Sequence, residues 1–252
     1  MRCLAVLLLL APFARSGAAA EVSTWALPSV GAVWTELRSP QTIAAVPAIQ
    51  ASDFSQASPG PALPKDVLPV PIHRQETDYS CGAASLLSVL RYWQAFDGKE
   101  SDLYGPLQTS PKDGTEPPKL RDVAEKLGLK AELRTEMTLD DLRLLLAKGT
   151  PVILDIQAWR EGSTAHIPWE KNWEDGHYVV LIGMDEKYAY FMDPVLNDSY
   201  AYMPLDELPK RWHDYEDRHG TVERYYQAGI ALSGKTPVSN PTLPHKRPAR
   251  LD

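Results

Sequence analysis

Residues 75–93 read QETDYSCGAASLLSVLRYW, and this stretch decides how the rest of the chain is interpreted. Its apolar residues recur at spacings of three and four, which predicts one face of a helix. They are Ala83, Leu86, Leu87, Leu90 and Trp93. Ser80 or Asp78 can cap that helix, so Cys81 falls in its first turn. The free N–H groups and the positive end of the helix dipole favour a thiolate there.

Cys81 has two interpretations. Gly82, Ala83 and Ala84 carry almost no side chain, so they leave room for a substrate backbone beside a nucleophilic thiol. Gln75 lies six residues earlier, where its amide can point at the same position. Alternatively, Cys81 is a small buried apolar residue in a structural protein.

The first twenty residues favour the catalytic interpretation. They read MRCLAVLLLLAPFARSGAAA, with Arg2 at the start, an apolar run too short to span a bilayer and small residues at the end. This pattern predicts a signal peptide over 1–20, and therefore export to the periplasm or the medium. Removal of Cys3 with this segment would leave Cys81 as a single thiol in an oxidising compartment, where an unused thiol is a hazard.

The net charge of the chain argues against two classes of binding partner. The formal charge is −7 and would become −9 after loss of Arg2 and Arg15, which argues against nucleic acid or an anionic membrane as the main partner. No run after residue 20 is long and apolar enough to cross a membrane, so no integral membrane segment is expected after signal cleavage. The sequence does not fix the oligomeric state.

The chain divides by composition into four parts: the signal peptide (1–20), an Ala/Pro/Ser-rich linker or arm (21–66), one catalytic domain (67–234) and a proline-rich tail (235–252) that we expect to be disordered. Within the domain, periodicity predicts an edge strand over 67–72, a loop over 97–118 and a long surface loop over 158–174. Further helices are expected over 114–129, 138–148 and 204–212. Strands are expected over 130–134, 151–156, 177–183, 188–193 and 229–233.

A thiol nucleophile needs a base, and the base usually needs a third group that orients it. Among six histidines, only His177 opens a buried strand; His213 and His219 look solvated. If the two strands after it form a hairpin that turns about Asp185, His177 lies opposite Asp193, whose carboxylate would accept the Nδ1 proton. A turn centred half a residue later would place Asp193 opposite Tyr178 instead. The alternative is a strand-edge histidine and a carboxylate in a turn before Pro194.

The order Gln…Cys-Gly-Ala-Ala…Gly-His-Tyr-Val-Val-Leu…Asp-Pro resembles the bacteriocin-processing cysteine peptidases, papain-like enzymes that cut leader peptides after a double glycine. The resemblance runs over about 72–195. It implies an α+β papain-like fold in which a helix carrying Cys81 packs on an antiparallel sheet carrying His177 and Asp193. It also implies Cys81 as nucleophile, His177 as general base and acid, Asp193 as its orienting group and Gln75 as oxyanion-hole donor.

The predicted function is therefore an exported cysteine peptidase that acts on a peptide or protein substrate through a thioester acyl-enzyme, without a metal or cofactor. With a signal peptide and no transporter segments, the chain is expected to be a stand-alone member, and double-glycine specificity is not carried over. Two competitors remain open: a cell-wall amidase or acyltransferase on the same catalytic plan, and a catalytically idle relative that binds peptides.

Overall fold

The computed structural model describes residues 60–160, 162–218, 220–239 and 242–252. The predicted signal peptide and nearly all of the predicted arm lie outside the described residues. The helices are α1 (Cys81–Tyr92), α2 (Ser101–Leu107), α3 (Pro117–Lys126), α4 (Leu139–Ala147) and α5 (Leu208–Arg211), with short 3₁₀ turns η2 (Gly162–Thr164) and η3 (Trp169–Lys171). The strands are β1 (Lys130–Arg134), β2 (Val152–Gln157), β3 (Gly176–Met184), β4 (Tyr188–Met192), β5 (Ala201–Pro204), β6 (His213–Arg218), β7 (Thr221–Tyr226), β8 (Gly229–Ser233) and β9 (Ala249–Arg250).

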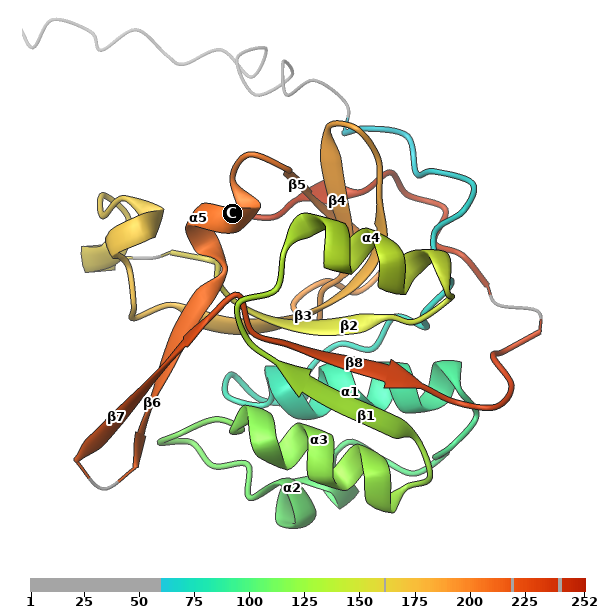
Figure 1. The fold of residues 1–252 in the computed structure, drawn as a ribbon, viewed down its shortest axis with the longest axis horizontal. Helices are drawn as coiled ribbons and strands as arrows, with labels where there is room; N and C mark the ends of the chain where they lie inside the picture. The colour runs from blue at the N-terminus through green and yellow to red at the C-terminus, as the bar shows by residue number, and fades with distance from the viewer. Residues whose placement is uncertain (1–59, 161, 219, 240–241) are drawn as a thin grey trace, which may run out of the picture. The chain divides into compact units, whose positions relative to one another are not determined.

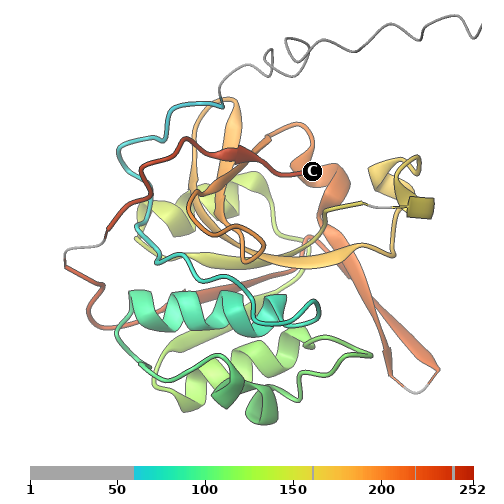
Figure 2. The same cartoon turned by 180° about the vertical axis from the view of Figure 1, so that it is seen from behind.

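Seven of these strands form one sheet in the order β1-β8-β2-β3-β4-β5-β9. Its pairs are antiparallel except the parallel pair of β5 with β9. Helices α1, α2 and α3 lie along one face and α4 along the other (Figure 1; Figure 2 shows the reverse side). Strands β6 and β7 form a separate hairpin that projects from the sheet (Figure 1). This arrangement confirms the predicted α+β class with an antiparallel sheet.

The sheet has an apolar core on each face because its central strands are buried on both sides. All six residues of β2 are buried, and so are seven consecutive residues of β3 from His177 to Gly183. On one face Val180 and Ile182 pack with Leu86 and Leu90 of α1. On the other face Val179 and Leu181 belong to a second cluster that includes α4 and Trp212. The helix that carries Cys81 is thus held directly against the strand that begins beside His177.

Local signals located most elements correctly. Helix α4 begins with the capping box that its Thr138 and Asp141 suggest: Thr138 Oγ1 accepts from the Asp141 N–H at 3.1 Å, and the Asp141 carboxylate accepts from the Thr138 N–H at 2.9 Å. Strands β1, β2, β3, β4 and β8 lie within about one residue of their expected bounds.

Four features differ from the sequence analysis: three expectations were wrong, and one hairpin was not predicted. No strand forms over 67–72; Leu68 N donates to Ile182 O at 2.8 Å, but the prolines on either side of Val70 cannot extend a ladder. The expected loop over 97–118 contains α2, held by the buried pair Leu103 and Leu107 one helical turn apart. The hairpin β6–β7 was missed because its strands are rich in charged residues.

The fourth concerns the tail, which we expected to be disordered. Strand β9 pairs with β5, and Leu251 is fully buried in the cluster that includes Trp212. Arg250 donates both of its ion-pairing bonds to the carboxylate of Glu207, at 2.6 and 2.7 Å. A few specific contacts therefore order a segment whose composition lacks any periodicity. None of the helices among the described residues is both long and apolar enough to cross a membrane.

Candidate active site

Helix α1 presents Cys81 as its first residue, with the thiol partly exposed. Ser80 is the N-cap residue, but its side chain does not cap the helix. Instead the Ser80 hydroxyl accepts from Thr77 N at 3.1 Å and donates to Thr77 O at 3.2 Å, which shapes the preceding loop. The N–H groups of the first turn therefore remain available beside the sulfur, where the helix dipole favours negative charge.

The small residues after Cys81 have a different role from the expected one. Ala83 and Ala84 are fully buried. A Cβ on Gly82 would lie 2.8 Å from Thr115 Cβ and 3.1 Å from the ring of Tyr178. These positions are small so that α1 can approach the sheet and the 112–116 loop closely, not to admit a substrate backbone. Ser85 Oγ also links α1 to strand β3, because it donates a hydrogen bond to Tyr178 O at 3.2 Å.

His177 and Asp193 form a buried pair, with side chains 8% and 0% exposed. His177 Nε2 lies 2.9 Å from Asp193 Oδ1, whereas the sequence analysis expected Nδ1 at this position. Because Nε2 is engaged, Nδ1 is the nitrogen available to the thiol of Cys81, which lies close enough to the His177 ring to contribute to its raised pKa. The structure thus brings Cys81, His177 and Asp193 together in one chain of contacts.

The electrostatics of this pair favour a cationic imidazole. Burial alone would lower the pKa of His177, but the adjacent Asp193 carboxylate and the hydrogen bond that it accepts outweigh burial. Cys81 acts in the same direction as Asp193. Together they raise the pKa of His177 to about 10. The site therefore stabilises an imidazolium at neutral pH.

The pairing of β3 with β4 differs from both registers that we weighed. Val180 pairs with Met192 and Leu181 with Phe191, two positions from the register that would place His177 opposite Asp193. A bulge between Leu181 and Gly183 displaces the register again near the turn. Asp193 follows the end of β4 and reaches His177 diagonally, because residues two apart on a strand share a face.

Two further donors hold Asp193 in place. Trp159 Nε1 donates to Asp193 Oδ2 at 3.0 Å, and Val195 N donates to Asp193 Oδ1 at 2.9 Å. The sequence analysis missed Trp159, which lies in a tryptophan-rich loop without a motif around it. Its backbone has a positive φ of 59°, a conformation that is uncommon for a non-glycine residue.

Gln75 lies on the approach to α1, as predicted, and its backbone N donates to Pro194 O at 2.9 Å, next to Asp193. One N–H of its amide donates to Thr77 O at 2.7 Å. A primary amide has a second N–H. Gln75 Oε1 is buried without a hydrogen-bond partner among the described residues.

His213 is not solvated, contrary to expectation. Its ring is buried, Nε2 lies 2.7 Å from Asn172 O, and burial lowers its pKa. The signal that was missed is the β6–β7 hairpin itself, whose base packs this ring against Trp173. The next residue, Asp214, lines a small acidic cleft beside Gly176, the residue before His177.

One cluster has the composition of a metal site. Ligand atoms of His73, Glu76 and Glu100 lie within 4.8 Å of one another. Both ring nitrogens of His73 are engaged, by Glu100 Oε2 at 2.8 Å and by Arg91 Nη1 at 3.1 Å. Glu100 also accepts from Tyr104 Oη at 2.8 Å. These hydrogen bonds give the cluster a structural role, which is to support the loop that carries Gln75.

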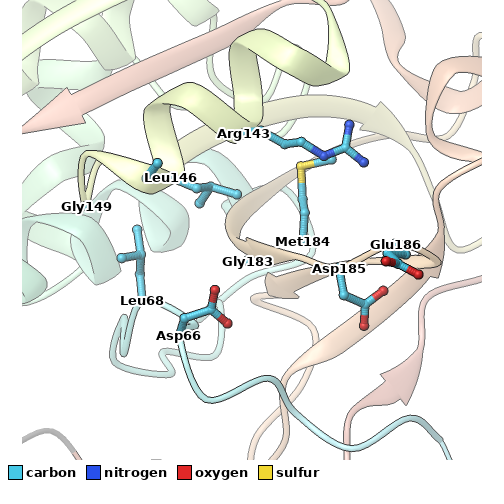
Figure 3. A pocket seen from close by; sticks show the side chains of 10 residues that line it. Asp66, Leu68, Arg143, Leu146, Gly149, Gly183, Met184, Asp185 and Glu186 are labelled. Atoms are coloured by element: carbon cyan, nitrogen blue, oxygen red, sulfur yellow. The ribbon is translucent and has the colours of Figure 1, made fainter.

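A larger hollow lies elsewhere. It has a volume of about 800 Å³ and is bordered by α4, the β3–β4 turn and the segment around Leu68 (Figure 3). Its charged side chains are those of Asp66, Arg143, Asp185 and Glu186. None of its lining residues belongs to the candidate catalytic set, so its size alone does not make it the active site.

Comparison with known proteins gives the following likenesses among solved structures. A putative C39-like peptidase from Bacillus anthracis is 20% identical, with a TM-score of 0.49, over 68% of this chain and 98% of that chain. A double glycine motif protease from an AMS/PCAT transporter, solved in complex with the leader peptide, is 20% identical, with a TM-score of 0.47, over 71% of this chain and 100% of that chain. The peptidase domain of Streptococcus ComA is 20% identical, with a TM-score of 0.47, over 66% of this chain and 99% of that chain.

No curated protein gives a significant match. The model of the Peptidase_C39 like family matches residues 67–219, which is more than half of the chain. This match covers the segment that carries Gln75, the helix that begins with Cys81, and both His177 and Asp193. It confirms the resemblance found in the sequence and supports a peptidase. The chain belongs to the Peptidase_C39 like family.

Proposed function

We propose that this protein is an exported cysteine peptidase that hydrolyses peptide bonds with Cys81 as nucleophile, His177 as general base and acid, and Asp193 as the group that orients His177. The observation that carries the proposal is the 2.9 Å contact between the Asp193 carboxylate and His177 Nε2, together with the effect of the nearby Cys81 thiol on the pKa of the same ring. Membership of a peptidase family supports it independently.

The chemistry follows from the ring geometry. With Nε2 bonded to Asp193, Nδ1 takes the thiol proton, and Cys81 Sγ attacks the carbonyl carbon of the substrate. The protonated Nδ1 then gives its proton to the leaving amine, and a thioester remains on Cys81. Water attacks this thioester while Nδ1 accepts a proton from it, and return of that proton to sulfur restores the free enzyme.

We assign two donors to the negative oxygen of each tetrahedral intermediate. One is the backbone N–H of Cys81 at the uncapped start of α1. The other is the amide N–H of Gln75 that does not bind Thr77 O. Loss of one such donor typically lowers the rate about 10²–10³-fold, so Gln75→Ala should lower kcat strongly with a smaller effect on KM.

The test compares wild-type protein with Cys81→Ala and His177→Ala on a mixture of unmodified peptides and, separately, on muropeptides, with products read by mass spectrometry. Peptide cleavage that both variants abolish, with circular dichroism unchanged, is the expected result. Cleavage of muropeptides alone would replace the peptidase by a cell-wall amidase. Wild-type protein that binds peptides but cuts neither substrate would support the idle relative.

Export is part of the proposal and rests on residues 1–20. Fractionation of cells that produce the full chain tests it. We expect the protein in the periplasm or the medium, shortened at its N-terminus, and full-length protein that stays in the cytoplasm would contradict export.

A further inference from the structure

Trp159 holds Asp193 from a strained backbone conformation. Its φ of 59° lies in the left-handed region, which a residue with a large side chain rarely adopts. Such a conformation is unfavourable and persists only where the surrounding contacts fix it. From it the indole Nε1 reaches Asp193 Oδ2 at 3.0 Å. The contacts that fix the Trp159 backbone therefore bear on the candidate catalytic residues.

Arg211 of α5 joins two segments that flank Trp159. Its Nε donates to Gln157 O at 2.8 Å, two residues before Trp159 in the sequence. Its Nη1 donates to Leu251 O at 3.0 Å. The next residue, Asp252, accepts a hydrogen bond from Trp159 N through its main-chain oxygen. One guanidinium thus links the end of β2 to the C-terminal segment that binds the Trp159 backbone, and this segment lies beside α5 (Figure 1; Figure 2).

The Arg211 side chain is fully buried, which is a costly place for a cation. Burial lowers the pKa of Arg211 to about 10, so the guanidinium is still charged at neutral pH. Glu207 Oε2 lies 3.6 Å from Nη1, and Nη2 has no hydrogen-bond partner among the residues that the structure describes. An apolar side chain would fill the same space without this cost, but it could not donate to either carbonyl. Arg211 therefore contributes the relative position of the two segments that it joins.

The same guanidinium packs against residues that follow Trp159. The guanidinium carbons of Arg211 and Arg160 lie 3.8 and 3.6 Å from the centre of the Trp169 ring, within the range of cation–π contacts. Arg160 Nη1 also donates to Ile167 O at 2.6 Å. Because Arg160 directly follows Trp159, the chain is fixed on both sides of the strained residue.

We propose that Arg211 is a positioning residue that holds Trp159 in the conformation from which its indole donates to Asp193. Without that donor the Asp193 carboxylate turns more freely, and its Oδ1 faces His177 Nε2 for less of the time. The imidazolium–thiolate population at neutral pH then falls. This positioning role deepens the proposed function and rests on it.

The test measures the rate at which iodoacetamide alkylates Cys81 in the whole protein between pH 5 and pH 10, by peptide mapping. Arg211→Lys is the test variant, because lysine keeps the charge but has one nitrogen, which cannot take the places of Nε and Nη1 together. Trp159→Phe removes the indole donor, and a protein with both substitutions completes a double-mutant cycle. Arg143→Lys is the control, since Arg143 lies on α4 with its side chain 45% exposed. His177→Ala gives the rate without the ion pair.

At pH 6, Arg211→Lys and Trp159→Phe should each react about tenfold more slowly than wild type, which is the order expected for one hydrogen bond to a charged group. The doubly substituted protein should react no more slowly than Trp159→Phe alone, because Arg211 acts through Trp159. All three should converge with wild type near pH 10, with circular dichroism unchanged. Arg143→Lys should follow wild type at every pH.

Additive effects, with the doubly substituted protein about a hundredfold slower at pH 6, would overturn the positioning role. An Arg211→Lys profile that superimposes on wild type would also overturn it and leave the proposed function standing. If Arg211→Lys fails to fold, Glu207→Gln decides by the same cycle, because Glu207 pairs with Arg211 and Arg250 and its side chain is 24% exposed. A wild-type profile that matches His177→Ala would overturn the proposed function and the positioning role with it.

Discussion

Replacement of Asp193 by asparagine keeps the size of the side chain and removes the charge that faces His177. The folded protein raises the pKa of His177 from 6.5 to about 10 against the opposing effect of burial, and Asp193 is the largest favourable cause. At ~1.4 kcal/mol for each pKa unit, the imidazolium gains about 5 kcal/mol in this site. Asparagine keeps a hydrogen-bond acceptor but not the charge, so we expect Asp193→Asn to lose roughly half of this stabilisation of the imidazolium. That loss corresponds to a factor of about 10² in the imidazolium–thiolate population.

The assay is the rate of Cys81 alkylation by iodoacetamide between pH 5 and pH 10, measured by peptide mapping so that Cys3 does not interfere. Wild-type protein should react at pH 6 nearly as fast as at pH 8, because protonated His177 holds the thiolate. Asp193→Asn should react about 10²-fold more slowly at pH 6 and converge with wild type near pH 10. His177→Ala is the reference without the ion pair. Superimposable pH profiles for wild type and Asp193→Asn would refute the electrostatic reasoning.

Three other substitutions test neighbouring contacts. Trp159→Phe removes the donor to Asp193 Oδ2, so kcat should fall about tenfold while KM and the melting temperature change little, as steady-state kinetics and calorimetry will reveal. Burial raises the pKa of Asp155, so its ionisation lowers stability as pH rises above about 4; Asp155→Asn should raise Tm at pH 8 but not at pH 4, and an equal rise at both pH values would contradict this. Gly82→Ala should cost about 1–3 kcal/mol in urea unfolding through steric overlap, whereas Gly105→Ala, with open space around it, should not destabilise the protein.

Local patterns in the sequence predict the helix and strands that hold the candidate catalytic residues. Helix α1 follows from the spacing of its leucines, and strands β2 and β3 follow from mainly apolar runs, because the burial that selects those residues is nearly complete. The roles assigned to Cys81, His177, Asp193 and Gln75 remain predictions for the alkylation and cleavage assays.

Other features of the structure are not predicted by any local pattern in the sequence. The hairpin β6–β7 reads as a charged loop, since neither strand has an apolar face, and it orders through its base at His213 and Trp173. Strand β9 is two residues long and depends on the edge of β5 and on the ion pair of Arg250 with Glu207. Trp159 is distant in sequence from Asp193, so its hydrogen bond cannot be inferred from spacing.

The sequence by itself determined the α+β class, the position of Cys81 at a helix start and the family resemblance, because these depend on residue types within short windows. Only the tertiary structure decided that Nε2 rather than Nδ1 of His177 meets Asp193, and that a bulge displaces the register of β3 against β4. Only the tertiary structure placed Asp155 and Asp214 together beside Gly176, because they come from strands 59 positions apart. Contacts between distant segments are fixed by packing, and packing is a property of the whole fold.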